Sequence, residues 1–262
     1  MAKFSCFIGS NKVLNTSMNT TTERNQKPNL DSLSDNVHIW LISFKKLVSD
    51  YHDFYAMLSP DEIERAHQFR FAKDRNAFVI TRGALRKLIS HYLSIQAIDI
   101  SFRYTEYDKP VLRTPENNTI QFNVSHSGDY GLIAISRCSP LGIDIEEMKT
   151  DLDLMEMAQQ VFSGSEYQQL IQLPEAKRIQ AFYNGWTRKE AYIKGDGKGL
   201  SIPLKSFNVS LVDKEQPILL ATAHDEQACD HWSIYNINTP ENYAGALAIK
   251  SKKCQIKLFI YQ

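Results

Sequence analysis

The stretch LGIDIEEMK, residues 141–149, alternates apolar and acidic side chains as a half-buried β-strand does. Ile143 and Ile145 fall on one face of this strand, and Asp144 and Glu146 fall on the other. Residues on one strand face lie about 7 Å apart at Cα, so the two carboxylates could converge on one hard cation such as Mg²⁺. A solvated face of ordinary surface acids would have the same pattern, and this segment alone leaves both interpretations open.

A second stretch, RIQAFYNGWTRKEAYIK at residues 178–194, has the apolar spacing of a helix with one face toward the core. The residues of that stripe are Ile179, Phe182, Tyr183, Trp186 and Ile193. Glu190 falls in its centre, where a carboxylate is costly unless it is paired, protonated or bound to metal. Lys194 lies four residues on, but a simple Glu–Lys helix pair would normally lie on the outer face. The placement therefore favours a functional role for both residues.

The glycines that follow, KGDGKGL at residues 194–200, match neither common phosphate-binding loop, and Gly195 is expected to cap the helix. NVSHSG, residues 123–128, is expected to end a strand in a polar turn suited to anion binding. Ser125 and His126 are adjacent and should point to opposite sides of an extended chain. Because the sequence also lacks a GxSxG elbow, a nucleophilic role for Ser125 is not favoured.

Basic residues gather on two successive helices predicted in the first half of the chain. A solvated helix face is the usual reason for such a cluster, although Arg65 shares a face with Phe69 and could point into a cleft. The residues of this cluster are Arg65, Arg70, Lys73, Arg75, Arg82, Arg86 and Lys87.

The composition is that of an ordinary globular protein. The 30 basic and 30 acidic residues balance, which argues against a bulk nucleic-acid binder or a protein adsorbed on membranes by charge. No apolar run approaches the roughly 18 residues of a membrane-spanning helix. The four cysteines are far apart and lack metal-binding spacing, so a reduced, cytoplasmic protein is expected.

The pattern of elements predicts an α+β fold. Residues 1–36 are expected to form a disordered polar leader, followed by domains at 37–139 and 140–262. Ser59 and Glu62 form the capping box of a first helix, and a second helix ends near His91. The further helices expected are 153–161, 164–171 and 175–194. The strands expected are 37–44, 98–104, 119–124, 130–137, 141–146, 205–211, 217–222, 231–237, 243–249 and 255–261.

Three of these motifs in this order, NVSHSG, LGIDIE and WTRKEAYIKGDGKGL, resemble the 4′-phosphopantetheinyl transferases, in particular the larger surfactin-synthetase-activating type. SPDEIERAHQFRFAKDRNAFVITRGALRKLI and YDKPVL also look like that family, and the resemblance runs from about residue 37 to the end. It implies two pseudo-symmetric α+β halves, with coenzyme A in the cleft between them.

The resemblance also implies roles for individual residues. Asp144, Glu146 and Glu190 would hold Mg²⁺, with Mn²⁺ also acceptable, and Lys194 would pair with the phosphate under attack. The residues implied for the rest of coenzyme A are Arg65, Lys109, Asn123, Ser125 and His126, with His126 near the 3′-phosphate. Two departures concern the adenosine end, since Glu62 replaces a lysine of some members and Phe78 replaces a hydroxyl.

The implied reaction is transfer of 4′-phosphopantetheine to a serine of an acyl- or peptidyl-carrier protein, with Glu190 as the base and Asp144 and Lys194 assisting. A monomer is expected, with no nucleic acid or membrane as a partner. The carrier is expected near Val161, Phe162 and Tyr167, and the pathway stays open among fatty acid, polyketide, nonribosomal peptide and glycolipid synthesis. A Mg²⁺-dependent phosphodiesterase and a non-catalytic coenzyme A-binding module are the alternatives.

Overall fold

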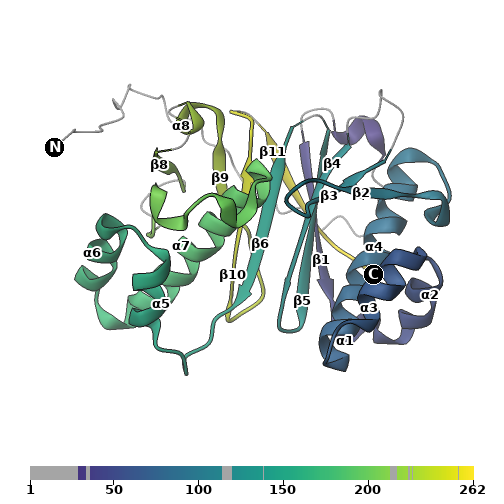
Figure 1. Cartoon of the computed structure of the whole chain (residues 1–262), viewed down its shortest axis with the longest axis horizontal. Coiled ribbons are helices and arrows are strands. Elements are labelled where there is room, and N and C mark those ends of the chain that lie inside the picture. The colour runs from purple at the N-terminus through teal and green to yellow at the C-terminus, as the bar shows by residue number, and fades with distance from the viewer. Residues whose placement is uncertain are drawn as a thin grey trace. The chain divides into compact units, whose positions relative to one another are not determined.

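The computed structural model describes residues 29–33, 36–113, 120–137, 139–212, 217–223, 225, 227–252 and 254–262. The chain forms two compact units. The N-terminal unit takes its described residues from Asn19–Ser139 and Cys254–Gln262, and the C-terminal unit takes them from Pro140–Lys253. Figure 1 shows that each unit combines helices with a β-sheet.

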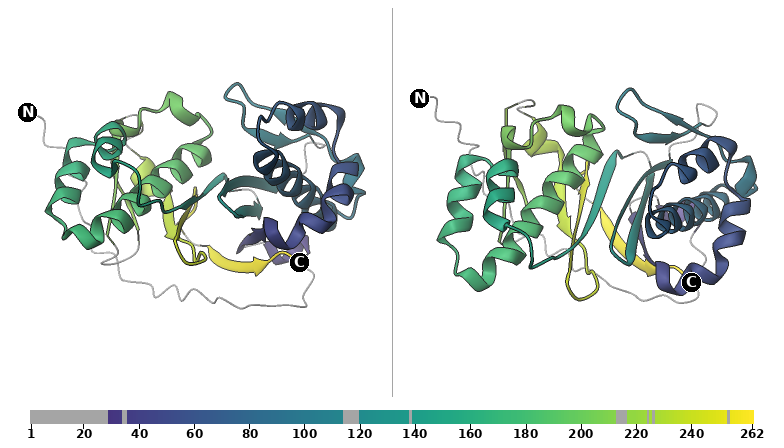
Figure 2. Two further views of the ribbon diagram at one scale, coloured as in Figure 1. Left: turned by 90° about the horizontal axis from the view of Figure 1, so that it is seen from below. Right: turned by 60° about the horizontal axis from the view of Figure 1, so that its bottom comes forward.

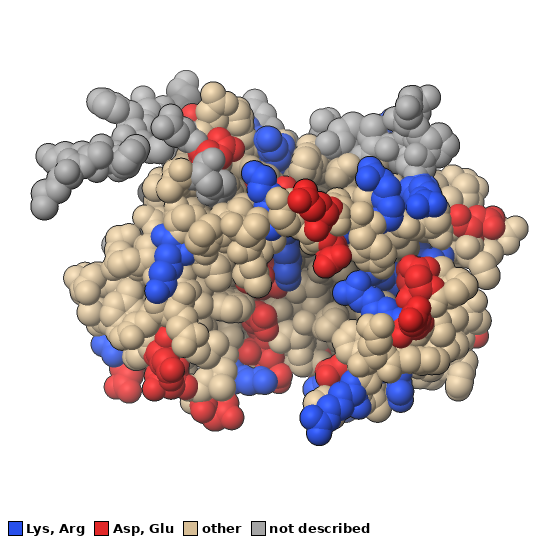
Figure 3. All heavy atoms as spheres, viewed as in Figure 1, with Lys and Arg blue, Asp and Glu red and all other residues tan. Residues whose placement is uncertain are grey.

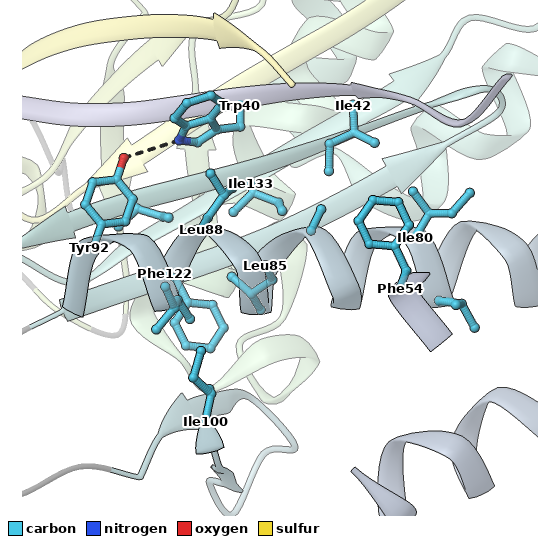
Figure 4. Packing of buried hydrophobic residues seen from close by; sticks show 14 of the residues in the cluster. Trp40, Ile42, Phe54, Ile80, Leu85, Leu88, Tyr92, Ile100, Phe122 and Ile133 are labelled. Atoms are coloured by element: carbon cyan, nitrogen blue, oxygen red, sulfur yellow. Dashed lines mark hydrogen bonds between the residues drawn. The ribbon is translucent and has the colours of Figure 1, made fainter. Parts of the chain in front are cut away.

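The N-terminal unit is built on a four-stranded sheet of order β11-β1-β5-β4. Its strands are β1 (Asn36–Ser43), β4 (Ile120–Ser127), β5 (Tyr130–Arg137) and β11 (Gln255–Ile260). The long helix α4 (Ala72–Leu93) packs beside this sheet, and Leu85 and Leu88 meet Trp40 and Ile133 between them (Figure 4). The shorter elements are η1 (Leu30–Leu33), α1 (Phe44–Leu47), η2 (Val48–Asp50), α2 (Tyr51–Ala56), α3 (Pro60–His67), η3 (Ala97–Asp99), β2 (Phe102–Tyr104) and β3 (Pro110–Leu112).

The C-terminal unit has an antiparallel sheet of order β6-β10-β9. Its strands are β6 (Leu141–Glu147), β9 (Ser233–Asn236) and β10 (Tyr243–Ile249). The long helix of this unit, α7 (Glu175–Asp196), packs against β6 and β10. The remaining elements are α5 (Leu154–Val161), α6 (Gly164–Gln172), η4 (Gly199–Ser201), η5 (Leu204–Ser206), β7 (Phe207–Val209), β8 (Leu219–Thr222) and α8 (Ala228–His231).

The two units repeat one plan. The strand order β1-β5-β4 of the first unit corresponds to β6-β10-β9 of the second, and each first strand leads through shorter helices to a helix of 22 residues. In each unit a capping box precedes the long helix, with Glu62 and Glu166 at its third position. Each glutamate then reaches a buried cation of the long helix at 2.8 Å, Arg86 in the first unit and Lys189 in the second.

Most of the predicted elements are confirmed. The helices predicted at 153–161, 164–171 and 175–194 appear as α5, α6 and α7 with ends shifted by at most two residues. Two predicted strands are shorter than expected, because residues 97–99 and 204–206 form 3₁₀ turns at their starts. The short helices α1 and α2 were not predicted, since neither is long enough to show a helical period.

The predicted leader is wrong at its end. Residues 30–33 form the 3₁₀ turn η1, which Asn29 starts by accepting a hydrogen bond from the Ser32 amide at 3.0 Å. Leu33 packs into the hydrophobic core, and this anchors the turn. The rest of the predicted leader, residues 1–28 and 34–35, lies outside the described residues.

The last strand belongs to the N-terminal unit, although residues 140–262 were expected to form one domain. β11, the yellow strand that leads to the C-terminus in Figure 2, belongs to this unit. It runs parallel to β1, from the pair Asn36 and Gln255 to the pair Leu41 and Ile260. Phe259 stacks on Trp40 with ring centroids 4.6 Å apart. The strand lies here because β1 offers it both backbone partners and an apolar face.

The surface in view carries charges of both signs. Acidic and basic side chains are interspersed on the face seen in Figure 3, with no large area of a single sign. Within the described ranges, none of the helices is long and apolar enough to cross a bilayer.

Candidate active site

The site in the C-terminal unit is set by a close contact between the backbones of β6 and α7. A Cβ atom built on Gly142 would overlap the Ala191 carbonyl and the Gly195 amide. Gly195 is restricted as well, because a Cβ there would lie 2.7 Å from the Trp232 ring. The two glycines therefore allow the strand that carries Asp144 to lie directly on the helix that carries Glu190 and Lys194.

The role of Gly195 differs from the one expected. The helix continues to Asp196, and Gly197 ends it in the left-handed conformation, with φ 90°. The Gly197 amide donates to the Ile193 carbonyl at 3.0 Å. Gly195 is needed instead for the packing of helix on strand.

Asp144 and Lys194 form an ion pair across this contact. The Lys194 Nζ lies 2.6 Å from the Asp144 Oδ1. The aspartate is 1% exposed, whereas the lysine side chain is 30% exposed and reaches solvent. Burial lowers the pKa of Lys194, but the charges of Asp144, Glu190 and Glu146 outweigh it and raise that pKa overall. Lys194 is therefore a fixed positive charge at this site.

Glu190 lies close enough to Lys194, Asp144 and Glu146 for their charges to shift its pKa. Burial raises its pKa to about 7; Lys194 opposes this rise, while Asp144 and Glu146 add to it. The sequence predicted that Glu190 lies in an apolar stripe of this helix. The stripe residues Phe182, Tyr183 and Ile193 are buried, as that prediction requires.

Glu146 is held from the side by Trp186, one turn before Glu190. The Trp186 Nε1 donates to the Glu146 Oε1 at 3.4 Å, which is a long hydrogen bond. The indole also stacks on Phe182, with ring centroids 6.2 Å apart. From the sequence, Trp186 was expected in the core stripe only. The signal that could have revealed this contact is an indole N–H that needs an acceptor when it is partly buried.

The donor atoms at this site suit a hard divalent cation. Asp144, Glu146 and Glu190 offer carboxylate oxygens only, the ligands that Mg²⁺ prefers. The two other carboxylates raise the pKa of Glu190, and a bound cation would relieve this repulsion. As the side chains stand in the described part of the chain, no three acidic, His or Cys groups converge at metal distance. The Asp144 Oδ1 instead faces Lys194.

The other predicted site residues lie in the N-terminal unit. Asn123 and Ser125 are 8% and 7% exposed on β4, and His126 is exposed beside the Phe44 ring. β4 continues to Ser127, so the prediction of a turn that begins at Ser125 is wrong. The chain turns only from Gly128, which has a positive φ. The strand extends because each of these residues pairs with β5.

Two further basic residues of the prediction lie on separate elements of this unit. Lys109 lies in the turn between β2 and β3, where its carbonyl accepts from the Thr105 amide at 3.0 Å. Arg65 lies near the end of α3, and its guanidinium carbon is 5.9 Å from both the Phe78 and the Tyr104 ring centroids. Asn123, Ser125 and His126 share one strand, whereas Lys109 and Arg65 lie on other elements of the unit.

The predicted carrier-contact strip is wrong. Val161 and Phe162 are 5% and 2% exposed, and both belong to the hydrophobic core of the C-terminal unit. Tyr167 packs against the same core and is only partly buried. The apolar residues at this position serve the packing of α5 and α6 on α7.

We expect Gly142→Ala to disturb this site strongly. The added methyl group would push β6 away from α7, because both of its nearest contacts are backbone atoms that cannot rotate aside. Overpacking of this kind costs about 1–3 kcal/mol, and a shift of about 1 Å at a reacting group can cost about a hundredfold in rate. Chemical unfolding and an assay of activity would measure the two effects. Gly164→Ala is the matched control, because nothing lies within 4 Å of a Cβ there.

Comparison with known proteins agrees with this geometry. The model of the 4′-phosphopantetheinyl transferase superfamily matches residues 140–248, and that of the 4′-phosphopantetheinyl transferase N-terminal region matches residues 43–138. The chain is 34% identical over 236 residues to the 4′-phosphopantetheinyl transferase HetI of Nostoc sp., covering 89% of this chain and 96% of that one. The chain belongs to the 4′-phosphopantetheinyl transferase superfamily.

Two further proteins, one known by its sequence and one by its solved structure, also match this transferase. It is 36% identical over 172 residues to the 4′-phosphopantetheinyl transferase Sfp of Bacillus subtilis, covering 65% of this chain and 75% of that one. A solved holo-(acyl-carrier-protein) synthase of Bacillus anthracis, in complex with CoA (3′,5′-ADP), matches with a TM-score of 0.33 and 20% identity, covering 38% of this chain and 92% of that one. The chain is thus a 4′-phosphopantetheinyl transferase of the Sfp type with an α+β fold.

Proposed function

We propose that this transferase moves the 4′-phosphopantetheine group of coenzyme A to a serine of an acyl- or peptidyl-carrier protein and releases adenosine 3′,5′-bisphosphate. The observation that supports this proposal most is the group around Glu190. One carboxyl with a pKa near neutrality lies within the field of two carboxylates and one fixed lysine charge. Groups with perturbed pKa values in such an arrangement are typical of proton transfer.

Asp144, Glu146 and Glu190 would hold a Mg²⁺ or Mn²⁺ ion. When bound, such an ion would polarise the pyrophosphate of coenzyme A and neutralise charge on the departing phosphate. The Lys194 ammonium would then face the phosphate under attack from its position beside Asp144. Phosphoryl chemistry of this kind depends mostly on positioning and charge neutralisation.

The proton of the carrier serine would pass to Glu190, directly or through one water. The serine Oγ forms a bond to the β-phosphorus, and the bond from that phosphorus to the bridging oxygen breaks. Because the pKa of Glu190 is raised to about 7, its carboxylate is a better proton acceptor than an ordinary glutamate, and about half of it is ionised at neutral pH. Lys194 would neutralise the negative charge that develops on the phosphate oxygens.

Residues of the N-terminal unit would bind the remaining parts of coenzyme A. Ser125 and His126 would contact phosphates, with the Asn123 amide on the same strand. Lys109 and Arg65 would add positive charge at the nucleotide end. The support for these roles is the match of their motifs to the family, together with the placement of Asn123 and Ser125 on one strand beside β5.

The direct test is the intact mass of an apo carrier protein after incubation with the full-length transferase, coenzyme A and Mg²⁺. We expect the carrier to gain the mass of one phosphopantetheine, and to gain none when a chelator is present. No gain with both acyl- and peptidyl-carriers would contradict the proposal. Hydrolysis of coenzyme A under those conditions would instead identify a phosphodiesterase.

The raised pKa of Glu190 predicts a stability effect in metal-free protein. The fold favours the protonated carboxyl, so wild-type stability should fall as the pH rises from about 4.5 to about 7. Glu190→Gln removes this cost, which is at most about 3 kcal/mol above pH 7. We expect the variant to melt at a higher temperature than wild type at about pH 8.5, and the difference to shrink toward about pH 5. Glu175→Gln, on an exposed turn of the same helix, should show no such trend.

A further inference from the structure

Phe71 is a large apolar side chain that the fold leaves in solvent. It stands at the N-cap of α4 and is 61% exposed, although Phe69, two residues before it, packs against the hydrophobic core. Its carbonyl accepts from the Arg75 amide at 3.1 Å, but its ring cannot cap the helix as a serine or an aspartate would. The helix therefore uses the backbone of Phe71 and not its ring.

Basic side chains lie next to this ring. The Arg70 guanidinium carbon is 5.3 Å from the Phe71 ring centroid. Lys73, in the first turn of α4, reaches Asp129 in the turn after β4, with its Nζ 3.3 Å from the Oδ1. The two side chains of this pair are 64% and 65% exposed, so water screens their attraction and the pair is weak.

The short helix α1 brings two further lysines to the same turn. The amide of Phe44, the first residue of α1, donates to the Asp129 carbonyl at 3.0 Å, and α1 packs against α4. Lys45 and Lys46 follow Phe44 and are exposed. Neither lysine has an ion-pair partner among the residues that the structure describes.

We call this surface the Phe71 patch. Around the ring it has four basic residues and two acidic ones, which are Arg70, Lys73, Lys45, Lys46, Asp74 and Asp129. A single exposed apolar side chain is common on monomeric proteins and needs no explanation by itself. An aromatic ring beside an arginine, by contrast, is the combination that the centres of protein interfaces favour. The excess of positive charge gives the patch a preference for an acidic partner.

The patch lies at the end of β4 that carries residues proposed to bind coenzyme A. The Phe44 ring lies 6.2 Å from the His126 ring, centroid to centroid. His126 and Asp129 are three residues apart, which is about 10 Å along an extended chain. A standard protein interface covers about 800 Å² of each partner, which corresponds to a disc with a radius of about 16 Å. A protein bound on the patch would therefore also cover the end of β4.

We propose that the Phe71 patch binds an acidic surface of the carrier protein, with the Phe71 ring at the centre of the contact. This assignment rests on the proposed function, in which a carrier must come to the coenzyme A that β4 helps to bind. It replaces the strip expected at Val161 and Phe162, whose side chains are buried. The lysines of the patch raise the rate at which an acidic carrier meets the ring in the correct orientation.

The test is the affinity of the full-length protein for fluorescently labelled apo acyl-carrier and apo peptidyl-carrier proteins, measured by anisotropy at low salt. Phe71→Ser should weaken binding by about tenfold or more, the loss expected when a central aromatic contact is removed. Serine is a preferred N-cap, so this variant should melt no lower than wild type. Ile98→Ser is the matched control, because Ile98 is 63% exposed on η3, beside the other end of α4, and it should leave the affinity unchanged.

The charges of the patch can be tested by reversal. Lys45→Glu combined with Lys46→Glu should weaken carrier binding by about tenfold at low salt and by less at about 0.5 M salt, where charges are screened. A carrier whose acidic residues beside the modified serine are replaced by lysine should bind wild type weakly and the double variant more tightly. Arg137→Glu is the control and should change neither affinity, since Arg137 is exposed at the end of β5 that lies away from the turn at Asp129.

Three outcomes would overturn the assignment. The first is equal affinity of wild type and Phe71→Ser for the carriers, and the second is a wild type that binds neither carrier. The third is binding to vesicles of phosphatidylserine and phosphatidylcholine, or self-association, that Phe71→Ser abolishes while carrier binding is kept. The patch would then belong to a membrane surface or to a second copy of this chain.

The transfer assay separates this inference from the proposed function. Phe71→Ser should raise the KM for the carrier by about tenfold or more, with kcat and the KM for coenzyme A within about threefold of wild type. If wild type modifies the carrier and Phe71→Ser has the same KM for it, only the inference fails. If the carrier binds through Phe71 but gains no mass, the patch stands and the proposed function fails.

Discussion

Replacing Glu190 by glutamine is expected to slow transfer to the carrier by about 10²- to 10⁴-fold, the range that removal of a general base produces. The amide is nearly isosteric with the carboxyl but accepts no proton. It also removes one of the three carboxylates proposed to hold the cation. Timed intact-mass measurements at saturating coenzyme A and Mg²⁺ would give the rate.

Two controls separate this loss from damage to the fold. Glu175→Gln changes an exposed residue of the same helix and should transfer at the wild-type rate. Glu190→Gln itself should be at least as stable as wild type at about pH 8.5, because the buried negative charge is gone. A rate within about threefold of wild type would show that Glu190 is not the base and would leave the proton to another acceptor.

Replacing Glu166 by alanine is expected to lower the free energy of unfolding of the C-terminal unit by about 3–5 kcal/mol, the cost of breaking a buried ion pair. The Glu166 Oε2 lies 2.8 Å from the Lys189 Nζ, and the two side chains are 2% and 0% exposed. The glutamate also accepts from the amides of Val209 and Ser163, each at 2.8 Å. Its loss therefore leaves the lysine charge without its carboxylate and two amides without their acceptor.

The ion pair can be tested as a pair by chemical unfolding followed by tryptophan fluorescence. Glu166→Leu combined with Lys189→Met should recover much of the stability that Glu166→Ala loses, since no unpaired charge remains. Glu156→Ala, at an exposed position of α5, should change stability by less than about 0.5 kcal/mol. A loss of less than about 1 kcal/mol in Glu166→Ala would mean that Lys189 keeps its position through the Leu204 and Phe207 carbonyls alone.

The features that could be predicted from the sequence are those with local signals. The capping box of Ser59 and Glu62 fixed the start of α3, and apolar spacing in residues 178–194 fixed the buried face of α7. The same spacing identified Glu190 as a carboxylate in apolar surroundings, before any contact was known. These signals work because helix periodicity and caps depend only on near neighbours in the chain.

The features that could not be predicted depend on distant parts of the chain. Lys189 has no local signal of burial, and its partners, Glu166 from α6 and the carbonyls of Leu204 and Phe207, explain why it is completely buried. Val161 and Phe162 looked like a possible exposed strip, yet they fill the space over α7. The approach of Gly142 to Gly195 has no local signature either, because a glycine gives no indication of which backbone will lie against it.

The pairing of β11 with β1 has a consequence for how the chain is made and how its gene can be divided. On the ribosome, the first sheet must wait for residues 255–260 before its last strand can join, although its other strands emerge much earlier. A gene cut between codons 139 and 140 would separate β1 from its neighbour β11, so the first product would lack a strand of its sheet and the second would carry a strand that belongs to the other unit. To divide the protein into two fragments that both fold, residues 254–262 would have to be added to the first fragment.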